Sequence, residues 1–399
     1  MLDGRRRTIV RRPLARVAAL AARFAGVRAY ALWPDGEHPM RGVDLRSRAG
    51  AEWLRATFDR DLPAPAGRFA SRAWRTLDAR TLAALRAGAV SFGPPPALTT
   101  MAAERALGHP MRHASVAMHS ASGSPTSKVT YFVFERGEAE PSLAVRTMPR
   151  AQDGPRLRLE IEAVEKVRGR CRHAPRVAAA LPTPPLYAGE IEGRYVAVLA
   201  LDPLASATGH ADRETALGWL TELQERTGQE PMPWTPHETE REVAEVVRAW
   251  DWARSEKTRN VREHTVDLFA QLEGATISRC IVHGDYWRGN IAQRDSDIRV
   301  FDWEWARESG HPFHDLWLYE IGEIRLRSET DPIVLTGLVR DGVARIETHL
   351  VARGLDARFA PAMLVPTLAR LVNRSRPNLD SPDDPLFGLM RTVERVLEA

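Results

Sequence analysis

Cysteine, lysine and long apolar runs are all scarce in this sequence. The only cysteines among its 399 residues are Cys171 and Cys280, too few for a disulfide scaffold or a cysteine-rich zinc site. No stretch approaches the run of about 18 apolar residues that a membrane-spanning helix needs. The sequence therefore predicts no spanning helix, and its few cysteines favour a reducing compartment, so we expect a cytoplasmic protein.

Because the chain has three lysines, nearly all of its positive charge is carried by arginine. Residues 1–100 contain 18 arginines, no lysine and 8 acidic residues, a net charge of about +10. The whole chain carries +4, which leaves about −6 for residues 101–399. An apolar fraction of 44% is typical of a globular protein and excludes a disordered chain. A basic segment before a mildly acidic body is not typical of a nucleic-acid-binding protein, and we expect no nucleic-acid partner.

The basic N-terminus resembles a signal peptide only superficially. Five arginines precede an apolar stretch at 13–27, but Arg16 and Arg23 interrupt it, and no small-residue cleavage site follows. The pattern favours an amphipathic helix with an arginine face. Such a helix either packs on its own domain or makes a peripheral contact with an anionic membrane or a protein partner.

Composition and periodicity divide the chain into three parts. Three consecutive prolines at 94–96 can neither continue a helix nor donate strand hydrogen bonds, and we place a boundary there. The pattern predicts an N-terminal α/β extension (1–98), a β-rich small lobe (99–202) and a mainly helical large lobe (203–399), an α+β fold. Strands are expected at 29–33, 129–134, 143–145 and 195–201, a helix capped by Ser47, and further helices at 157–167, 212–226, 238–255, 261–272, 314–327, 333–352, 361–374 and 386–397.

A short β insertion at 279–305 interrupts the helical part and carries polar residues where its strands end. Asp285 follows the apolar run 280–282, and Asn290 comes five residues later. Asp302 follows the next run, and the polar turn between the two runs predicts a hairpin that brings Asn290 and Asp302 alongside each other. Carboxylate and amide oxygens suit Mg²⁺. A carboxylate that does not bind metal can orient a hydroxyl and accept its proton, so the set predicts phosphoryl transfer.

These residues also resemble those of a known family. HGDYWRGN (283–290) is similar to the HGDxxxxN catalytic loop, and FDWE (301–304) to the (I/V/F)DWE metal motif, of the aminoglycoside phosphotransferase/choline kinase family. HPFHDLWLY (311–319) resembles the family's following helix start, and the resemblance covers roughly 112–375. It implies a protein-kinase-like bilobal fold. It also implies ATP- and Mg²⁺-dependent transfer of the γ-phosphate to a hydroxyl of a small molecule: a sugar, amino alcohol, aminoglycoside-like compound or cell-envelope precursor.

Carried over residue by residue, the resemblance implies a role for each matching position. Asp285 would be the catalytic base or orient the acceptor hydroxyl, with His283 and Asp315 bracing its loop. Asn290 and Asp302 would hold Mg²⁺. The remaining nucleotide-binding residues would be Ser122, Gly123, Ser124 and Lys128 over the ATP phosphates, and Leu199 and Leu201 in the adenine hinge. Trp287 and Glu304 would contact the acceptor or support the site.

The sequence departs from the protein-kinase pattern on the third strand of the small lobe. Protein kinases have a lysine there, and this chain has Arg146. A guanidinium can bind phosphate in a bidentate manner and pair with a helix glutamate, so we interpret Arg146 as functional. We expect its partner to be Glu162, with Glu160 and Glu165 as the other candidates.

Two further points stay open at the level of sequence. Taken alone, the His-Gly-Asp run is also typical of a simple turn, and the chain could be a catalytically silent nucleotide- or sugar-binding module, a pseudokinase. The acceptor is not fixed by the motifs either. An acidic lining beside Asp285 would favour amine acceptors.

Overall fold

The computed structural model consists of two compact units, one formed by residues 1–161 and 183–206 and the other by residues 162–182 and 207–399. The structure describes residues 9–11, 15, 18–19, 29–33, 41–45, 47–58, 80, 89–92, 97–111, 115–120, 128–135, 138–201, 209–253, 255–327, 329, 331–375 and 385–398. The amphipathic helix expected near 13–27 lies largely outside these ranges.

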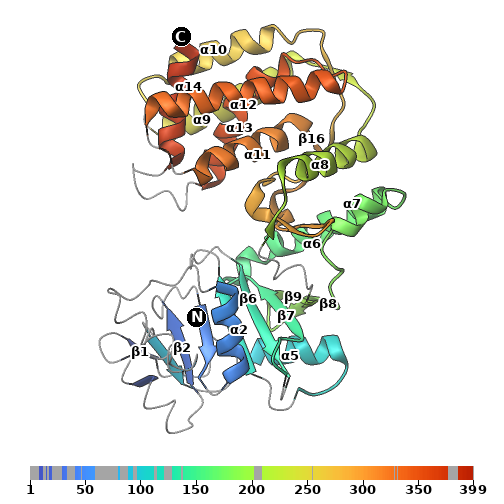
Figure 1. Cartoon of the computed structure of the whole chain (residues 1–399), viewed down its shortest axis with the longest axis vertical. Coiled ribbons are helices and arrows are strands. Elements are labelled where there is room, and N and C mark those ends of the chain that lie inside the picture. The colour runs from blue at the N-terminus through green and yellow to red at the C-terminus, as the bar shows by residue number, and fades with distance from the viewer. Residues whose placement is uncertain are drawn as a thin grey trace. The chain divides into compact units, whose positions relative to one another are not determined.

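The first unit is built on one antiparallel sheet of nine strands in the order β1-β4-β2-β3-β5-β6-β7-β9-β8 (Figure 1). The strands expected at 29–33 and 129–134 are confirmed with those bounds, and the other two differ by one or two residues at an end. The strands are β1 (Ile9–Arg11), β2 (Ala29–Trp33), β3 (Arg41–Asp44), β4 (Ala89–Phe92), β5 (Ser115–Ser120), β6 (Val129–Phe134), β7 (Leu143–Thr147), β8 (Tyr187–Ile191) and β9 (Arg194–Ala200).

The N-terminal strands continue the same sheet instead of forming a separate layer. β3 pairs with β5, and Val43 lies opposite Ala117 in that register. The structure thus shows no division at residue 98, where we placed a boundary, because backbone hydrogen bonds join the two sides of it. The units divide instead within the helix α6 (Gly154–Arg170), after Pro182 and after Ser206, which is four residues beyond the second expected boundary.

Three helices accompany this sheet: α2 (Arg48–Phe58), α5 (Ala97–Leu107) and α6 (Gly154–Arg170). The expected cap of the first is confirmed, since Ser47 Oγ accepts a hydrogen bond from the Gly50 N–H at 2.9 Å. Leu98, Ala102 and Ala103 of α5 pack with Val133 and Val145 of the central strands in one buried cluster. Burial of these apolar side chains holds the sheet that carries Lys128 and Arg146.

The second unit is mainly helical, and all seven helices expected in it are present, with ends that differ by at most three residues. They are α8 (Arg213–Thr227), α9 (Pro236–Trp252), α10 (Thr258–Ala270), α11 (Pro312–Leu326), α12 (Pro332–Ala352), α13 (Phe359–Ser375) and α14 (Pro385–Glu398), joined by the short α7 (Pro175–Ala180). Thr235 begins α9 with a capping box in which its hydroxyl and the Glu238 carboxylate each accept a backbone N–H. A mixed α+β architecture, as predicted, is confirmed.

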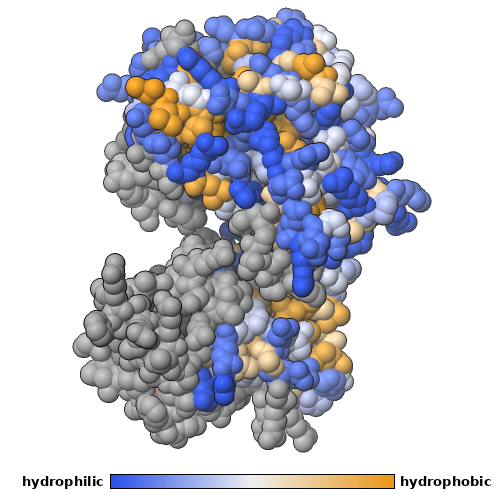
Figure 2. Space-filling model, in the orientation of Figure 1, coloured by the Kyte–Doolittle hydropathy of each residue, from blue (hydrophilic) through white to orange (hydrophobic). Residues whose placement is uncertain are grey.

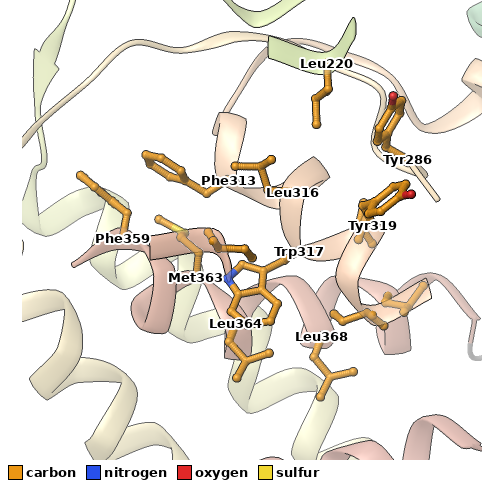
Figure 3. Close-up of a cluster of buried hydrophobic side chains, with 14 of the residues drawn as sticks. Leu220, Tyr286, Phe313, Leu316, Trp317, Tyr319, Phe359, Met363, Leu364 and Leu368 are labelled. Atoms are coloured by element: carbon orange, nitrogen blue, oxygen red, sulfur yellow. The ribbon is translucent and has the colours of Figure 1, made fainter. Parts of the chain in front are cut away.

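Helix α11 lies at the centre of the large unit's core. Figure 3 shows its side chains Phe313, Leu316 and Trp317 beside those of α13, including Phe359 and Met363. Trp317 is fully buried and donates its indole N–H to the carbonyl of Ala360 at 2.7 Å. Because this helix is packed on most of its surface, its first turn is held in a fixed position.

The expected β insertion is present as β13 (Cys280–Val282), β14 (Ile291–Arg294) and β15 (Asp297–Val300). β14 and β15 form the predicted hairpin, with Ile291 opposite Val300. β13 pairs separately with β16 (Arg307–Gly310). The insertion therefore brings two loops together, one after β13 and one after β15.

On the face drawn in Figure 2, the described residues are mostly hydrophilic, with apolar residues among them. Ile333 and Val351 on α12 are among the most exposed large apolar side chains. None of the described helices combines the length and the apolar character that crossing a membrane requires.

The turn after β13 requires glycine at position 284, which gives the first prediction. Gly284 has φ +76°, and a Cβ there would lie 2.2 Å from the carbonyl oxygen of Trp305. Gly354 has a similar φ of +68°, but a Cβ there would meet no atom within 4 Å, so it isolates the cost of backbone strain. We expect Gly284→Ala to lower the free energy of unfolding by about 3 kcal/mol and Gly354→Ala by about 1 kcal/mol. Urea unfolding measures both, and equal losses would show that the contact with Trp305 has no effect.

Candidate active site

The loop after β13 is held by a buried carboxylate on α11. Asp315 is fully buried, and its two oxygens accept the backbone N–H groups of His283 at 2.7 Å and Gly284 at 2.9 Å. Burial raises the pKa of Asp315, while the two N–H bonds oppose that shift. The sequence predicted Asp315 as a brace of this loop, and its geometry fits that role.

His283 links this loop to the one after β15. Its imidazole is buried, with Nε2 at 2.7 Å from the carbonyl oxygen of Phe301 and Nδ1 accepting the backbone N–H of Asp285 at 3.2 Å. A carbonyl only accepts, so Nε2 carries the proton and the ring is a neutral bridge. The residue therefore orients the backbone on either side of the candidate site, and nothing in these contacts gives it a proton-transfer step.

Asn290 and Asp302 are brought together by the hairpin. The Phe301 N–H donates to the Asn290 carbonyl at 2.9 Å, which places Asp302 next to Asn290 across the end of the ladder. The Asn290 amide N–H₂ also donates to the Asp285 side chain at 2.9 Å and to its carbonyl at 2.8 Å. Asp302 itself has φ +65°, a left-handed backbone conformation that is costly for a residue other than glycine and clusters at functional sites.

This donor set fits Mg²⁺ bound together with a phosphate. In the described part of the chain no group of three or more His, Cys, Asp or Glu side chains is placed to hold a metal. Magnesium commonly uses only one or two carboxylates, with waters and substrate phosphates completing its shell. One carboxylate and one amide oxygen are therefore a suitable protein contribution.

Arg374 is a site residue that the sequence analysis did not identify. Near the end of α13, its guanidinium pairs with the Asp285 carboxylate and donates to the carbonyl of Gly284. It also lies over the ring of Trp305, with its Cζ 5.6 Å from the ring centroid. The exposed fractions of the Asp285 and Arg374 side chains are 19% and 14%, so the pair is largely shielded from water.

Trp287 and Glu304 lie beside these residues. Trp287 is half-buried and packs on α11, where its Cβ lies 2.8 Å from the position that a Cβ on Gly322 would occupy. It lines a cavity of about 260 Å³ together with Asp285 and Arg374. Glu304 is half-buried in the turn after Asp302. Trp303 is fully buried and packs against Trp219, so it belongs to the core.

In the first unit, a single carboxylate pairs with two cations. Glu160 on α6 accepts from Lys128 Nζ at 2.9 Å and from Arg146 Nη1 at 3.2 Å. Its side chain is only 5% exposed. The expected pairing of Arg146 with Glu162 is wrong: Glu162 is exposed, because it points away from the buried stripe of the helix that contains Leu157 and Val164. Glu165 is exposed as well.

The remaining nucleotide-binding candidates are placed only in part. Leu199 and Leu201 are half-buried at the end of β9, whose Ala197 lies opposite Arg146 of β7. Lys128 directly precedes β6, and by strand alternation its side chain is on the same face as that of Arg146. Ser122, Gly123 and Ser124 lie outside the described residues.

Comparison with known proteins adds the family. Residues 126–343 match the family described as phosphotransferase enzyme family. No curated protein matches the chain. Similar solved structures include a putative fructosamine-3-kinase from Haemophilus somnus 129PT (10% identity, 75% of this chain and 96% of that chain, TM-score 0.46) and a thermostable mutant of the aminoglycoside phosphotransferase APH(4)-Ia in its apo form (13%, 75% and 98%, 0.44). A third is a macrolide 2'-phosphotransferase type I (15%, 75% and 96%, 0.44).

The family resemblance inferred from the two loop motifs is confirmed, and with it the assignment as a transferase. The matched segment contains Lys128, Arg146 and Glu160 of the first unit and the two loops of the second. Since it covers more than half of the sequence, the chain belongs to the phosphotransferase enzyme family.

Proposed function

We propose that this phosphotransferase uses ATP and Mg²⁺ to phosphorylate a hydroxyl group of a small molecule. The observation that carries the proposal is the arrangement of Asp285, Asn290 and Asp302, which two hydrogen-bonded loops hold together. A simple turn does not need an amide that donates to the Asp285 carboxylate. Nor does it need an aspartate with a positive φ at the end of the hairpin. These features argue against a silent binding module.

Asp285 is the residue that we assign to the acceptor. Its carboxylate receives the hydroxyl proton as the acceptor oxygen forms its bond to the γ-phosphorus, and the bond from that phosphorus to the bridging oxygen breaks with release of ADP. The Asn290 amide and the Arg374 guanidinium each bind one side of the carboxylate, so its orientation is fixed before the acceptor arrives.

Asn290 and Asp302 are the residues that would hold Mg²⁺, which when bound neutralises phosphate charge. Lys128 and Arg146 would contact the nucleotide phosphates. Lys128 and Arg146 both pair with Glu160, which holds the two cations next to each other, where a phosphate could contact both. Leu199 and Leu201, with the loop that contains Ser122, Gly123 and Ser124, are proposed to bind the rest of the nucleotide.

The first test of this proposal is Asp285→Asn, which keeps the shape of the side chain and removes its ability to accept a proton. We expect kcat to fall by about 100-fold or more. ATP affinity should stay close to that of the wild type, since Asp285 is assigned to the acceptor. Steady-state kinetics with a pool of hydroxyl compounds and isothermal titration with ATP measure the two effects. Full activity of the variant would refute the assigned role.

A second test compares Asp302 with another aspartate of the same hairpin. Asp302→Asn should weaken the Mg²⁺-dependent part of ATP binding by about tenfold or more, because an amide is a poorer Mg²⁺ ligand than a carboxylate. Asp297 is exposed on β15 of the same hairpin, so Asp297→Asn removes an equal charge without touching the site. Titrations with ATP in Mg²⁺ and in EDTA give the comparison. Equal behaviour of the two variants would contradict the metal assignment.

The third test concerns Glu160. Glu160→Gln leaves Lys128 and Arg146 without their shared counter-charge, and we expect the KM for ATP to rise by about tenfold as the two cations lose their fixed positions. Glu162→Gln, an exposed change two residues away, should alter it by less than about twofold. A larger effect of Glu162→Gln than of Glu160→Gln would show that the pairing seen in the structure is not the functional one.

A further inference from the structure

The proposed function does not specify the chemical class of the acceptor. A cavity beside Asp285 indicates that class. We propose that the acceptor carries an anionic group, a carboxylate or a phosphate, which binds in the cavity lined by Arg241, Arg307, Arg370 and Arg374. This inference rests on the proposed function, because only a phosphotransferase that acts on a small molecule has such an acceptor. The cavity itself lies wholly within the second unit, so its walls belong to one packed body.

The cavity is adjacent to the loop that carries Asp285. It has a volume of about 160 Å³, and Gly284 and Trp305 form part of its wall. Arg374 lines both this cavity and the larger one that contains Asp285 and Trp287. A small molecule that presents a hydroxyl to Asp285 can therefore place a second group next to Arg374 on the other side.

The lining is basic. All four of its ionised side chains are arginines, and no Asp or Glu is among its described lining residues. Two histidines also line it, but burial lowers the pKa of His311 to about 4 and that of His314 well below its usual value, so both are neutral near pH 7. An amine acceptor, which an acidic lining would favour, does not match this wall.

Two carboxylates form ion pairs with guanidinium groups of the wall. Glu242 is fully buried and pairs with Arg370 at 2.5 Å and Arg241 at 3.4 Å, while Asp285 pairs with Arg374. In the part of the chain that the structure describes, no ion pair joins Arg307 to a carboxylate. Burial lowers the pKa of Arg307 and the neighbouring Arg370 lowers it further, whereas Glu242 and Glu245 act in the opposite direction. An anion in the cavity would give this guanidinium a partner.

One of the lining histidines also supplies an unused donor. Arg241 Nη2 lies 3.0 Å from His311 Nε2, and a guanidinium only donates, so Nε2 accepts and the ring proton is on Nδ1. His311 is 2% exposed, and its Nδ1 has no hydrogen-bond partner among the described residues. The Nε of Arg370 and the Nε2 of His314 are likewise buried without a partner in that part of the chain. Buried polar groups without partners, beside several guanidinium groups, are typical of a site that binds a carboxylate or a phosphate.

Binding of inorganic phosphate to the full chain tests the cavity without any need for turnover. We expect Arg307→Gln to raise the Kd for phosphate by about tenfold in isothermal titration, with partial recovery in Arg307→Lys. Arg340, an exposed residue of α12 outside the cavity, provides the control, and Arg340→Gln should leave the Kd unchanged although it removes the same charge. Equal midpoints of urea unfolding show that both variants fold. A Kd that Arg307→Gln does not change would overturn the proposal.

Matched pairs of acceptors test whether an anionic group is required. They also show whether that group is a carboxylate or a phosphate. L-serine and ethanolamine differ by a carboxylate, and glycerol 3-phosphate and glycerol differ by a phosphate. We expect the member that carries the carboxylate or phosphate to have the higher kcat/KM. Arg307→Gln should lower kcat/KM about tenfold for that member alone. Preference for the uncharged or amine member, or an equal loss for both, would overturn the inference. Phosphate binding that depends on Arg307 without any ATP-dependent turnover would count against the proposed function and leave the anion site supported.

Discussion

The two hydrogen bonds that the Asp315 carboxylate accepts from backbone N–H groups fix the position of the whole candidate site. A carboxylate without solvent contact is stable only when hydrogen bonds replace its water, and the N–H groups of His283 and Gly284 do so at 2.7 and 2.9 Å. Asp315 can lie there because α11 buries Phe313 and Trp317 in the core of the second unit. The apolar packing of one helix therefore determines where the loop of Asp285 runs.

From this anchor, hydrogen bonds extend to the second loop. His283 connects to Phe301, Phe301 connects to Asn290, and Asn290 returns to Asp285. Only the step from Phe301 to Asn290 joins two main-chain groups, so the circuit depends on the side chains of His283 and Asn290. The positive φ values of Gly284 and Asp302 are the points at which the backbone must bend to close it.

Local sequence patterns account for most of the elements and for the second-unit part of the site, because Asp285, Asn290 and Asp302 are close in sequence and a hairpin of fixed register joins them. Glu160 was also within reach of such patterns: it falls inside the stripe formed by Leu157, Val164 and Val167, where a carboxylate must have a partner. Arg374 gives no such signal. It comes near Asp285 only through the packing of α13 on α11, 89 residues further along the chain. The sheet that crosses residue 98 likewise depends on long-range pairing.

In the proposed mechanism, the ion pair between Asp285 and Arg374 limits which acceptors can approach. Asp285 uses one oxygen for Arg374 and the other for Asn290, so an incoming hydroxyl must share the carboxylate with a guanidinium that is already in contact with it. A cationic group on the acceptor would be repelled by Arg374 at short range in a site where little water screens the charge. An anionic group gives the free edge of that guanidinium a second partner and lets the acceptor bind without breaking the pair. On this proposal, the same arginine orients the carboxylate and selects the charge of the molecule that reaches it.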